Sequence, residues 1–309
     1  MLLGRDHERH GIEQALARAR SGTSATLALL GEPGIGKTAL LGYAAERATG
    51  MQVLRARGIE SEAQIPFGSL LELLRPALGM IDAIPEPQAV ALEGALALRR
   101  GAAQERFAVG AATLSVLAAY AEQAPVAVLV DDAQWLDVSS AQALLFAFRR
   151  LVADPIAVFI AIREGEPSLL DGADLPALRI GGLTSDEAAK LMPGLAPETA
   201  ALLHRATAGN PLALLELAAD AGDLALAPEG APVQVSVRIS QAFLHRAGQL
   251  SKAARRALVL TAASDTSDLP TLERAAAARC QARRSTSRSG RAAASARCAA
   301  RRSSAGASV

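Results

Sequence analysis

Short runs of consecutive apolar residues alternate with longer segments of helical periodicity along the first half of the chain. The apolar runs predict strands at residues 25–30, 52–56, 126–130, 156–162 and 178–180. The segments between them predict helices at residues 37–49, 67–78, 89–100, 104–123 and 139–151. A short, wholly apolar run is typical of a strand that is buried on both faces. The alternation therefore predicts an α/β fold, with a parallel sheet covered by helices on both sides.

After the last of these runs, only helical patterns follow. They predict helices at residues 185–192, 197–207, 212–220, 235–249 and 251–263. Thr184 and Glu187 have the spacing of a capping box at the start of the first of these helices. We therefore expect an α/β domain in residues 1–165, an all-helical lid with the start of a further helical or winged-helix domain in residues 166–275, and a tail in residues 276–309.

Two local signals refine the helix boundaries. Pro85 and Pro87 predict a loop before the helix at residues 89–100, because proline interrupts regular backbone hydrogen bonding. Ser139 or Ser140 is the predicted N-cap of the helix at residues 139–151, because a hydroxyl can accept a hydrogen bond from a free backbone N–H of the first turn.

The composition excludes several functional classes. Aromatic residues make up 3% of the chain, which argues against a nucleic-acid binder that stacks bases on aromatic side chains. The 2 cysteines are too few for a disulfide scaffold or a four-cysteine zinc site. His7 and His10 would share one face of a helix. Without other ligands nearby, that pair indicates a solvated face rather than a metal site.

The ends of the chain and its uncharged stretches indicate a cytoplasmic protein. The first residues carry charge at Arg5 and Asp6, so no secretory leader is predicted. The longest uncharged stretch, residues 107–121, is shorter than the roughly 20 residues that a membrane-spanning helix needs. We expect no membrane partner.

Charge is distributed unevenly although the formal net charge is only +1. No acidic residue follows Glu273, and the segment from Ala275 onward contains eight arginines. Residues 1–274 therefore have a net charge of −7, which does not favour DNA binding by that part of the chain. The tail has two interpretations: a basic arm that binds nucleic acid, or the product of a shifted reading frame in GC-rich coding DNA. We favour the second, because the composition changes abruptly near Ala278, within a segment whose sequence is still typical of an ordered helix.

The strongest chemical signal is the string Gly31-Glu-Pro-Gly-Ile-Gly-Lys37-Thr38, which matches the phosphate loop, or Walker A motif, at every fixed position. Its glycines let successive backbone N–H groups turn toward phosphate oxygens, and the helix that follows directs its positive end at the same place. Lys37 would reach the terminal phosphates, and the Thr38 hydroxyl would bind Mg²⁺. The alternative is an ordinary glycine-rich turn, which the preceding strand and following helix make the weaker interpretation.

Polar residues at the ends of two further strands complete a candidate site. Asp131 would hold Mg²⁺, and Asp132 would orient or deprotonate the attacking water. Arg163 ends the strand at residues 156–162 and could sense the terminal phosphate. Strand ends are often polar, so each of these residues also has a plain structural interpretation. The segment Gly209-Asn-Pro211 reads, on residue chemistry alone, as the end of one helix and the start of another.

These pieces together resemble the N-terminal ATPase region of the large ATP-binding LuxR-type transcriptional regulators, which belong to the STAND class of P-loop ATPases and are related to AAA+ and origin-recognition ATPases. The resemblance covers roughly residues 1–275, and the string from Asp131 to Asp137 is its most specific part. The motifs that carry it are Leu3-Gly4-Arg5-Asp6, the phosphate loop, Pro66-Phe67-Gly68-Ser69-Leu70, Leu74-Arg75-Pro76, Val130-Asp131-Asp132-Ala133-Gln134-Trp135-Leu136-Asp137, Ala161-Ile162-Arg163-Glu164 and Gly209-Asn210-Pro211-Leu212-Ala213-Leu214.

The resemblance implies a strand order of 5-1-4-3-2 and a closed resting state with ADP, which ATP exchange would open for self-association. It also implies that Gly4 and Arg5 line the adenine pocket and that Pro211 reaches the nucleotide from the lid. Complete members continue into a helical-repeat sensor and a helix-turn-helix domain. This sequence lacks both, so we expect a truncated regulator without sequence-specific DNA binding of its own.

The resulting hypothesis is an ATP-binding switch with slow Mg²⁺-dependent hydrolysis. The alternatives are a non-catalytic interaction remnant and an AAA+ or origin-recognition-like ATPase. The predicted catalytic residues are Lys37, Asp132 and Arg163, and the predicted Mg²⁺ ligands are Thr38 and Asp131. The predicted contacts to ATP or ADP are Gly4, Arg5, Gly31, Glu32, Pro33, Gly34, Ile35, Gly36, Lys37, Thr38, Ala39 and Pro211.

Overall fold

The chain is described from a computed structural model, which covers residues 2–98, 106–169, 174–224 and 251–262. It divides into two compact units, Met1–Ala225 and Leu226–Val309. In the second unit, the described residues form one helix, α11 (Lys252–Ala262). The predicted helix at residues 235–249 and the predicted tail lie outside the described residues.

A five-stranded sheet forms the centre of the first unit, in the order β2-β3-β4-β1-β5. Each neighbouring pair runs parallel. This confirms the predicted α/β fold and the predicted order 5-1-4-3-2, read from the opposite edge. The strands are β1 (Ala25–Gly31), β2 (Gln52–Arg57), β3 (Val126–Asp131), β4 (Ile156–Arg163) and β5 (Ala177–Arg179).

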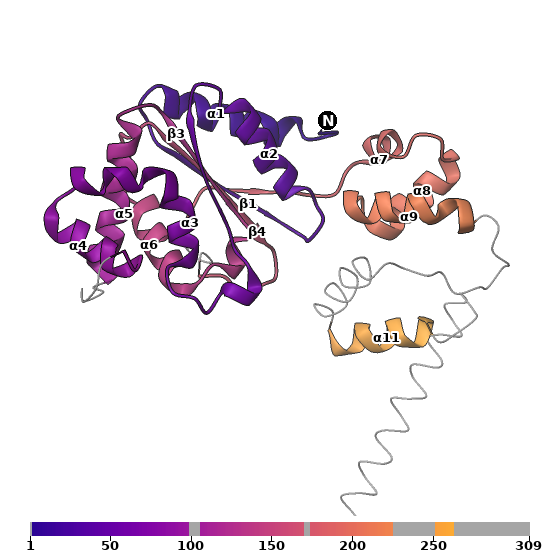
Figure 1. Cartoon of the computed structure of the whole chain (residues 1–309). Helices are drawn as coiled ribbons and strands as arrows, with labels where there is room; N and C mark the ends of the chain where they lie inside the picture. The colour runs from indigo at the N-terminus through magenta and orange to yellow at the C-terminus, as the bar shows by residue number, and fades with distance from the viewer. Residues whose placement is uncertain (1, 99–105, 170–173, 225–250, 263–309) are drawn as a thin grey trace, which may run out of the picture. The chain divides into compact units, whose positions relative to one another are not determined.

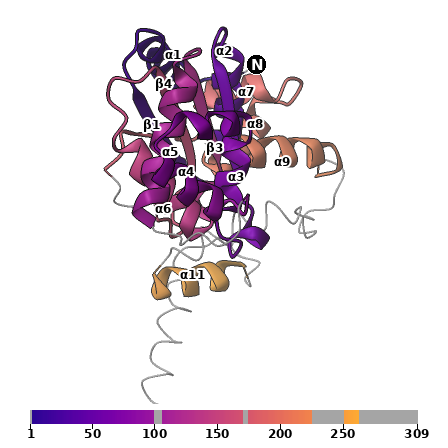
Figure 2. The same cartoon turned by 60° about the vertical axis from the view of Figure 1, so that its left-hand side comes forward.

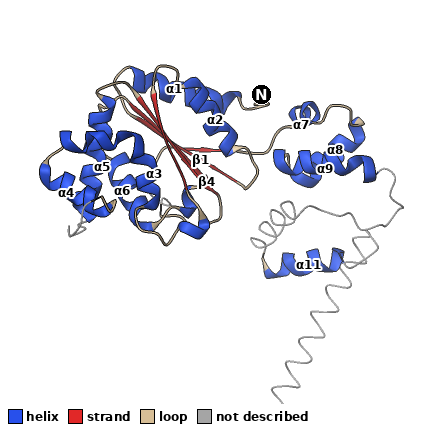
Figure 3. Ribbon diagram, in the orientation of Figure 1, coloured by secondary structure: helices blue, strands red, loops and turns tan. Residues whose placement is uncertain are grey.

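Side chains of the central strands alternate between two apolar layers, as a period of two requires. Val128 and Ile160 pack into one layer with the helices from α3 to α6, and Leu129 and Phe159 pack into the other with α1 and α2. Figures 1, 2 and 3 show the sheet between these two groups of helices. The helices are α1 (Asp6–Arg20), α2 (Lys37–Arg47), α3 (Gly68–Leu74), α4 (Glu86–Ala95), α5 (Arg106–Ala121) and α6 (Val138–Phe148), with 3-10 turns η1 (Glu60–Glu62), η2 (Arg75–Ala83) and η3 (Ala133–Trp135).

Helix α1 is an element that the sequence reasoning missed. Its buried apolar residues Ile12, Ala15, Leu16 and Ala19 follow the i, i+3, i+4, i+7 spacing of an amphipathic helix. That spacing was a usable signal, but charged side chains dominate the segment. The helix matters for the site because it begins directly after Arg5.

Two local predictions were wrong. Pro87 does not lie in a loop but in the first turn of α4, where a missing N–H costs nothing because no intrahelical partner exists for it. The N-cap of α6 is neither Ser139 nor Ser140 but Asp137, whose carboxylate accepts a hydrogen bond from the Ser140 N–H at 2.9 Å. A carboxylate also suits the positive end of a helix.

Three helices follow the sheet in the first unit: α7 (Ser185–Leu191), α8 (Pro197–Thr207) and α9 (Pro211–Leu224). The capping box predicted at Thr184 is present, with hydrogen bonds in both directions between Thr184 and Glu187. Among the described residues, none of the helices has the length and apolar character needed to cross a bilayer.

Candidate functional site

The predicted phosphate loop connects β1 to α2 and turns sharply between them. Gly34 has φ +76° and Gly36 has φ +108°, and Gly36 is the residue directly before α2. Residues with a Cβ rarely adopt these angles, so glycine is required for this path of the backbone. The loop therefore has the local conformation that a phosphate cradle needs.

Lys37 is the first residue of α2 and its side chain is buried. Its Nζ donates hydrogen bonds to the carbonyl oxygens of Gly31, at 2.7 Å, and Glu32, at 2.9 Å. Burial, together with the nearby positive charge of Arg163, lowers the pKa of Lys37 to about 8. The ammonium is thus aimed into the loop, where an anionic ligand would favour its charged form.

Thr38 and Asp131 are far apart in the sequence, but the fold places them side by side. Thr38 is in the first turn of α2, and Asp131 is the last residue of β3. The Thr38 hydroxyl donates a hydrogen bond to Asp131 Oδ2 at 2.9 Å. A hydroxyl beside a carboxylate, next to a phosphate-binding loop, is an all-oxygen donor set of the kind that Mg²⁺ prefers. The two residues that the sequence assigns to Mg²⁺ therefore lie together and fit that ion.

Asp132 is buried and has a left-handed backbone conformation, with φ +46°. Both oxygens of its carboxylate bind arginines. Arg163 donates to Oδ1 from Nε, at 3.2 Å, and pairs with it through Nη2, at 3.1 Å. Arg57 donates to Oδ2 from Nε, at 3.3 Å, and from Nη2, at 3.2 Å. The predicted water-orienting carboxylate therefore lies between two guanidinium groups.

Arg163, which the sequence assigns to sensing of the terminal phosphate, lies beside Asp132 and makes two further contacts. Its guanidinium carbon is 4.0 Å from the centre of the Trp135 ring, and its Nη1 is 3.5 Å from Glu166. Its side chain is only 23% exposed. A guanidinium with this many partners has a defined position, which distinguishes it from an ordinary solvated arginine at a strand end.

The N-terminal segment approaches the loop through Arg5, whose side chain is buried. Arg5 pairs with Glu8 at 3.0 Å and donates to the carbonyl oxygen of Ile35 at 2.9 Å. Gly4 lies against Glu187, so closely that an added Cβ would be 2.1 Å from the carboxyl carbon. The segment thus joins the phosphate loop to α7, and its predicted contact with adenine remains a prediction.

The segment around Pro211 also contacts the loop. Asn210 Nδ2 donates to the carbonyl oxygen of Pro33 at 2.9 Å, and the Leu212 N–H donates to that of Gly34 at 3.3 Å. A Cβ on Gly34 would be 2.8 Å from the Leu212 Cβ. The segment ends α8 and begins α9, as residue chemistry indicates, and it also joins these helices to the phosphate loop.

Sequence reasoning missed Arg57, Gln134 and Asp137 as residues of the site. Arg57 pairs in register with Asp131 at the ends of β2 and β3, so a polar residue directly after the predicted strand was the available signal. Asp137 accepts hydrogen bonds from the N–H groups of Phe67, at 2.8 Å, and Ser69, at 3.3 Å. Asp137 and Phe67 belong to separate motifs, and only the fold brings them together.

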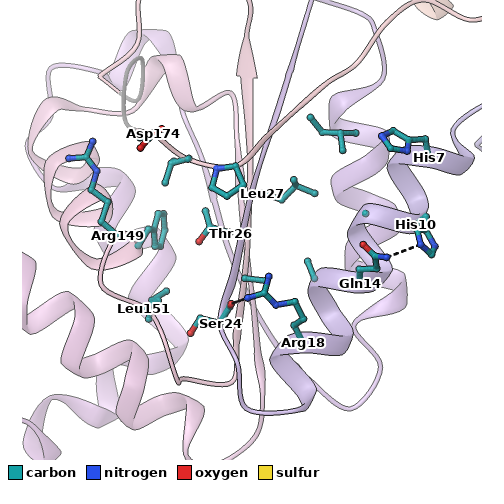
Figure 4. A pocket seen from close by; sticks show the side chains of 17 residues that line it. His7, His10, Gln14, Arg18, Ser24, Thr26, Leu27, Arg149, Leu151 and Asp174 are labelled. Carbon is teal, nitrogen blue, oxygen red and sulfur yellow. Dashed lines mark hydrogen bonds between the residues drawn. The ribbon is translucent and has the colours of Figure 1, made fainter.

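A groove of about 550 Å³ lies elsewhere, between α1 and the start of β1. Figure 4 shows His7, His10, Gln14 and Arg18 along its α1 side. The groove is at the end of β1 opposite to the phosphate loop. His10 is hydrogen-bonded to Gln14 at 2.8 Å, and the described residues contain no cluster of three His, Cys, Asp or Glu side chains suited to a metal ion.

Comparisons with known proteins identify a family for the first part of the chain. Residues 1–160, just over half of the chain, match the family described as AAA ATPase domain. Similar solved structures include RuvB from Thermotoga maritima, at 17% identity and a TM-score of 0.42, covering 72% of this chain and 63% of that one.

Two further structures are similar at the same identity. A STAND protein with a tetratricopeptide repeat sensor from Pyrococcus horikoshii has 17% identity and a TM-score of 0.40, over 82% of this chain and 34% of that one. A chain of the Drosophila ORC, bound to DNA, has 17% identity and a TM-score of 0.46, over 85% of this chain and 68% of that one. The present chain thus spans 63% of the RuvB chain and a third of the STAND protein. No curated protein matches it.

Proposed function

The chain belongs to the AAA ATPase domain family, and on that premise we propose that it is an ATP-binding switch with slow, Mg²⁺-dependent hydrolysis. The observation that carries the proposal is the convergence of four side chains just beyond the carboxyl ends of β1 and β3: Lys37, Thr38, Asp131 and Asp132. In open parallel sheets this edge is where ligands bind.

Different residues would bind the nucleotide and assist its hydrolysis. The backbone N–H groups of the loop and the Lys37 ammonium would bind the phosphates, and Thr38 and Asp131 would hold Mg²⁺. When bound, Mg²⁺ supplies positive charge that offsets the charge developing on the transferred phosphoryl group. Asp132 would orient the attacking water and accept its proton.

Slow hydrolysis follows from the surroundings of Asp132. Both oxygens of its carboxylate already accept hydrogen bonds from Arg57 and Arg163, so an attacking water has to compete with two guanidinium groups for these acceptors. Slow hydrolysis suits a switch, because the bound nucleotide has to persist as long as the signal does.

The resemblance in the motifs supports a role within a LuxR-type transcriptional regulator, with nucleotide-dependent self-association. Under this proposal, Pro211 and the contacts of its neighbours Asn210 and Leu212 with the loop let the helical lid respond to the nucleotide. A net charge of −7 in residues 1–274 argues against DNA binding by this portion, so DNA recognition would come from another part of the regulator.

The test is nucleotide binding by the purified chain, first by identifying nucleotide released on denaturation and then by calorimetric titration with Mg-ATP and Mg-ADP. We expect co-purified ADP or micromolar affinity. Lys37→Ala should abolish binding, whereas Lys190→Ala removes the same charge from an exposed position on α7 and should leave it unchanged. If the parent chain binds neither nucleotide, the chain is an interaction remnant and the proposal fails.

A further inference from the structure

The most specific motif of the sequence contains two residues, Gln134 and Trp135, that the proposed reaction does not use. Both lie in η3, directly after Asp132. Gln134 contacts two residues of the site at once. Its Nε2 donates to Asp132 Oδ1 at 3.2 Å, and its Oε1 accepts from the Arg163 N–H at 3.2 Å. One amide therefore links the end of β3 to the end of β4.

Trp135 supports the side chain of the same arginine. Its ring lies under the Arg163 guanidinium, with 4.0 Å from the ring centre to the guanidinium carbon. The ring attracts the cation electrostatically, and more strongly where water is excluded. Only 23% of the Arg163 side chain is exposed, so much of the surrounding water is excluded. The contact therefore limits the positions that the guanidinium can adopt.

The backbone explains why these two side chains point back at Arg163. Asp132 adopts the left-handed conformation, and the Trp135 N–H donates to the Asp132 carbonyl oxygen at 2.9 Å. The Asp132 N–H in turn donates to Asp131 Oδ1 at 2.9 Å. This closed turn fixes residues 132–135, so Gln134 and Trp135 are held where they meet the arginine.

From these contacts, we propose that Gln134 and Trp135 are positioning residues that orient the Arg163 guanidinium, and that this orientation determines how strongly the site discriminates ATP from ADP. The inference rests on the proposed function and deepens it. An arginine side chain loses much conformational freedom when it binds a ligand. The Arg163 guanidinium already lies against the Trp135 ring and pairs with Asp132 Oδ1, the oxygen that Gln134 also binds. Gln134 in addition holds the backbone N–H of Arg163. The side chain therefore loses less freedom on binding, and its contribution to recognition of a third phosphate is larger.

The test measures two affinities of the full chain by calorimetry, one for ADP and one for a non-hydrolysable ATP analogue, both in the presence of Mg²⁺. The quantity compared between variants is the ratio of these two affinities. Trp135→Leu should lower the ratio of the two affinities about fivefold, as expected for a contact of this kind. Trp135→Phe keeps an aromatic face and should restore most of the ratio. Gln134→Leu should lower it as well, because both hydrogen bonds are lost.

Phe146→Leu is the matched control. Arg150, just after the end of α6, lies over the ring of Phe146 on that helix at 3.6 Å, so this variant removes a similar pair and should leave the ratio unchanged. Equal loss of affinity for both nucleotides in Trp135→Leu, with the ratio preserved, would mean a merely structural role and would overturn the inference. So would an unchanged ratio in all the variants. Failure of the parent chain to bind either nucleotide is a different result, because it removes the proposed function itself.

Discussion

At the scale of single residues, the site contains charges whose properties depend on close neighbours. Lys37 is the clearest case, because burial and Arg163 bring its pKa to about 8. Asp132 is the complementary case, because two arginines occupy both of its oxygens. Each residue leads to a prediction about solution behaviour.

Nucleotide affinity should depend on pH through Lys37. Below pH 8 the side chain carries its proton before binding, so binding is nearly independent of pH. Above pH 8 it is mostly neutral and has to take up a proton to bind phosphate, so affinity should fall by up to about tenfold per pH unit. Calorimetry at pH 8.5 in two buffers with different ionisation enthalpies measures this uptake. An equal heat of binding in both buffers would contradict the assignment.

Replacement of Asp132 should separate binding from hydrolysis. Asp132→Asn keeps the shape of the side chain but removes the charge and the proton acceptor. We expect nucleotide affinity to change by less than about threefold, and the rate of phosphate release to fall about 100-fold. Asp186→Asn, on the exposed first turn of α7, is the control. Hydrolysis at the parental rate in Asp132→Asn would show that another group accepts the proton.

At the scale of elements, Asp137 connects the start of α6 to the start of α3. It is 2% exposed and accepts hydrogen bonds from the N–H groups of Ser140, Phe67 and Ser69. Ser140 adds a parallel link, since its hydroxyl oxygen accepts from the Leu70 N–H at 2.8 Å. Two motifs about 70 residues apart thereby form one structural unit beside the site.

Asp137→Ala should therefore destabilise the fold. It leaves buried N–H groups without a partner and removes a helix cap, so the free energy of unfolding should drop by about 3 kcal/mol. Urea denaturation followed by circular dichroism measures the change. Asp186→Ala, which removes an exposed acidic residue from the first turn of α7, should cost less than about 1 kcal/mol. Similar costs for both variants would refute the bridging role of Asp137.

Asn210, between α8 and α9, makes two contacts that one substitution can separate. Its Oδ1 accepts from the Ala213 N–H at 3.3 Å, at the start of α9, while its Nδ2 donates to the Pro33 carbonyl oxygen in the loop. Asn210→Ser keeps an oxygen for the helix but removes the donor to the loop. We expect nucleotide dissociation to accelerate about fivefold in stopped-flow measurements, which corresponds to one lost hydrogen bond.

Asn210→Ala is the companion variant, because it removes both contacts. It should release nucleotide as fast as Asn210→Ser and should also lower the thermal midpoint of the chain. A parental dissociation rate in Asn210→Ser would mean that the loop contact contributes nothing to retention of the nucleotide.

At the scale of the whole molecule, the sheet was more predictable than the contacts around it. The strands at residues 126–130 and 156–162 are wholly apolar because both faces are covered, and that pattern is local. The charged segment of α1 concealed a regular apolar face around Leu16. The strand order came from the resemblance, and the structure confirms it.

The sequence predicts some residues of the candidate site and misses others. The phosphate loop and Asp131 can be recognised from residue types and spacing, because each stands at the end of a recognisable strand. The contacts of Arg57 with Asp132 and of Asn210 with Pro33 join residues 75 and 177 positions apart, and no local pattern identifies the partner of either residue. Long-range contacts of this kind depend on the register of the strands and on the packing of the lid, which the sequence pattern leaves open.

The stacking of Arg163 on Trp135 has an optical consequence. Trp135 is the only tryptophan among the 309 residues, so the tryptophan emission of the whole protein, excited at wavelengths that the 2 tyrosines do not absorb, comes from one indole beside the site. A guanidinium over the ring and a carboxylate nearby set the local electric field that the excited indole experiences. Any ligand that moves Arg163 changes that field. The protein therefore carries its own fluorescent reporter, and no dye has to be attached to follow the site in real time.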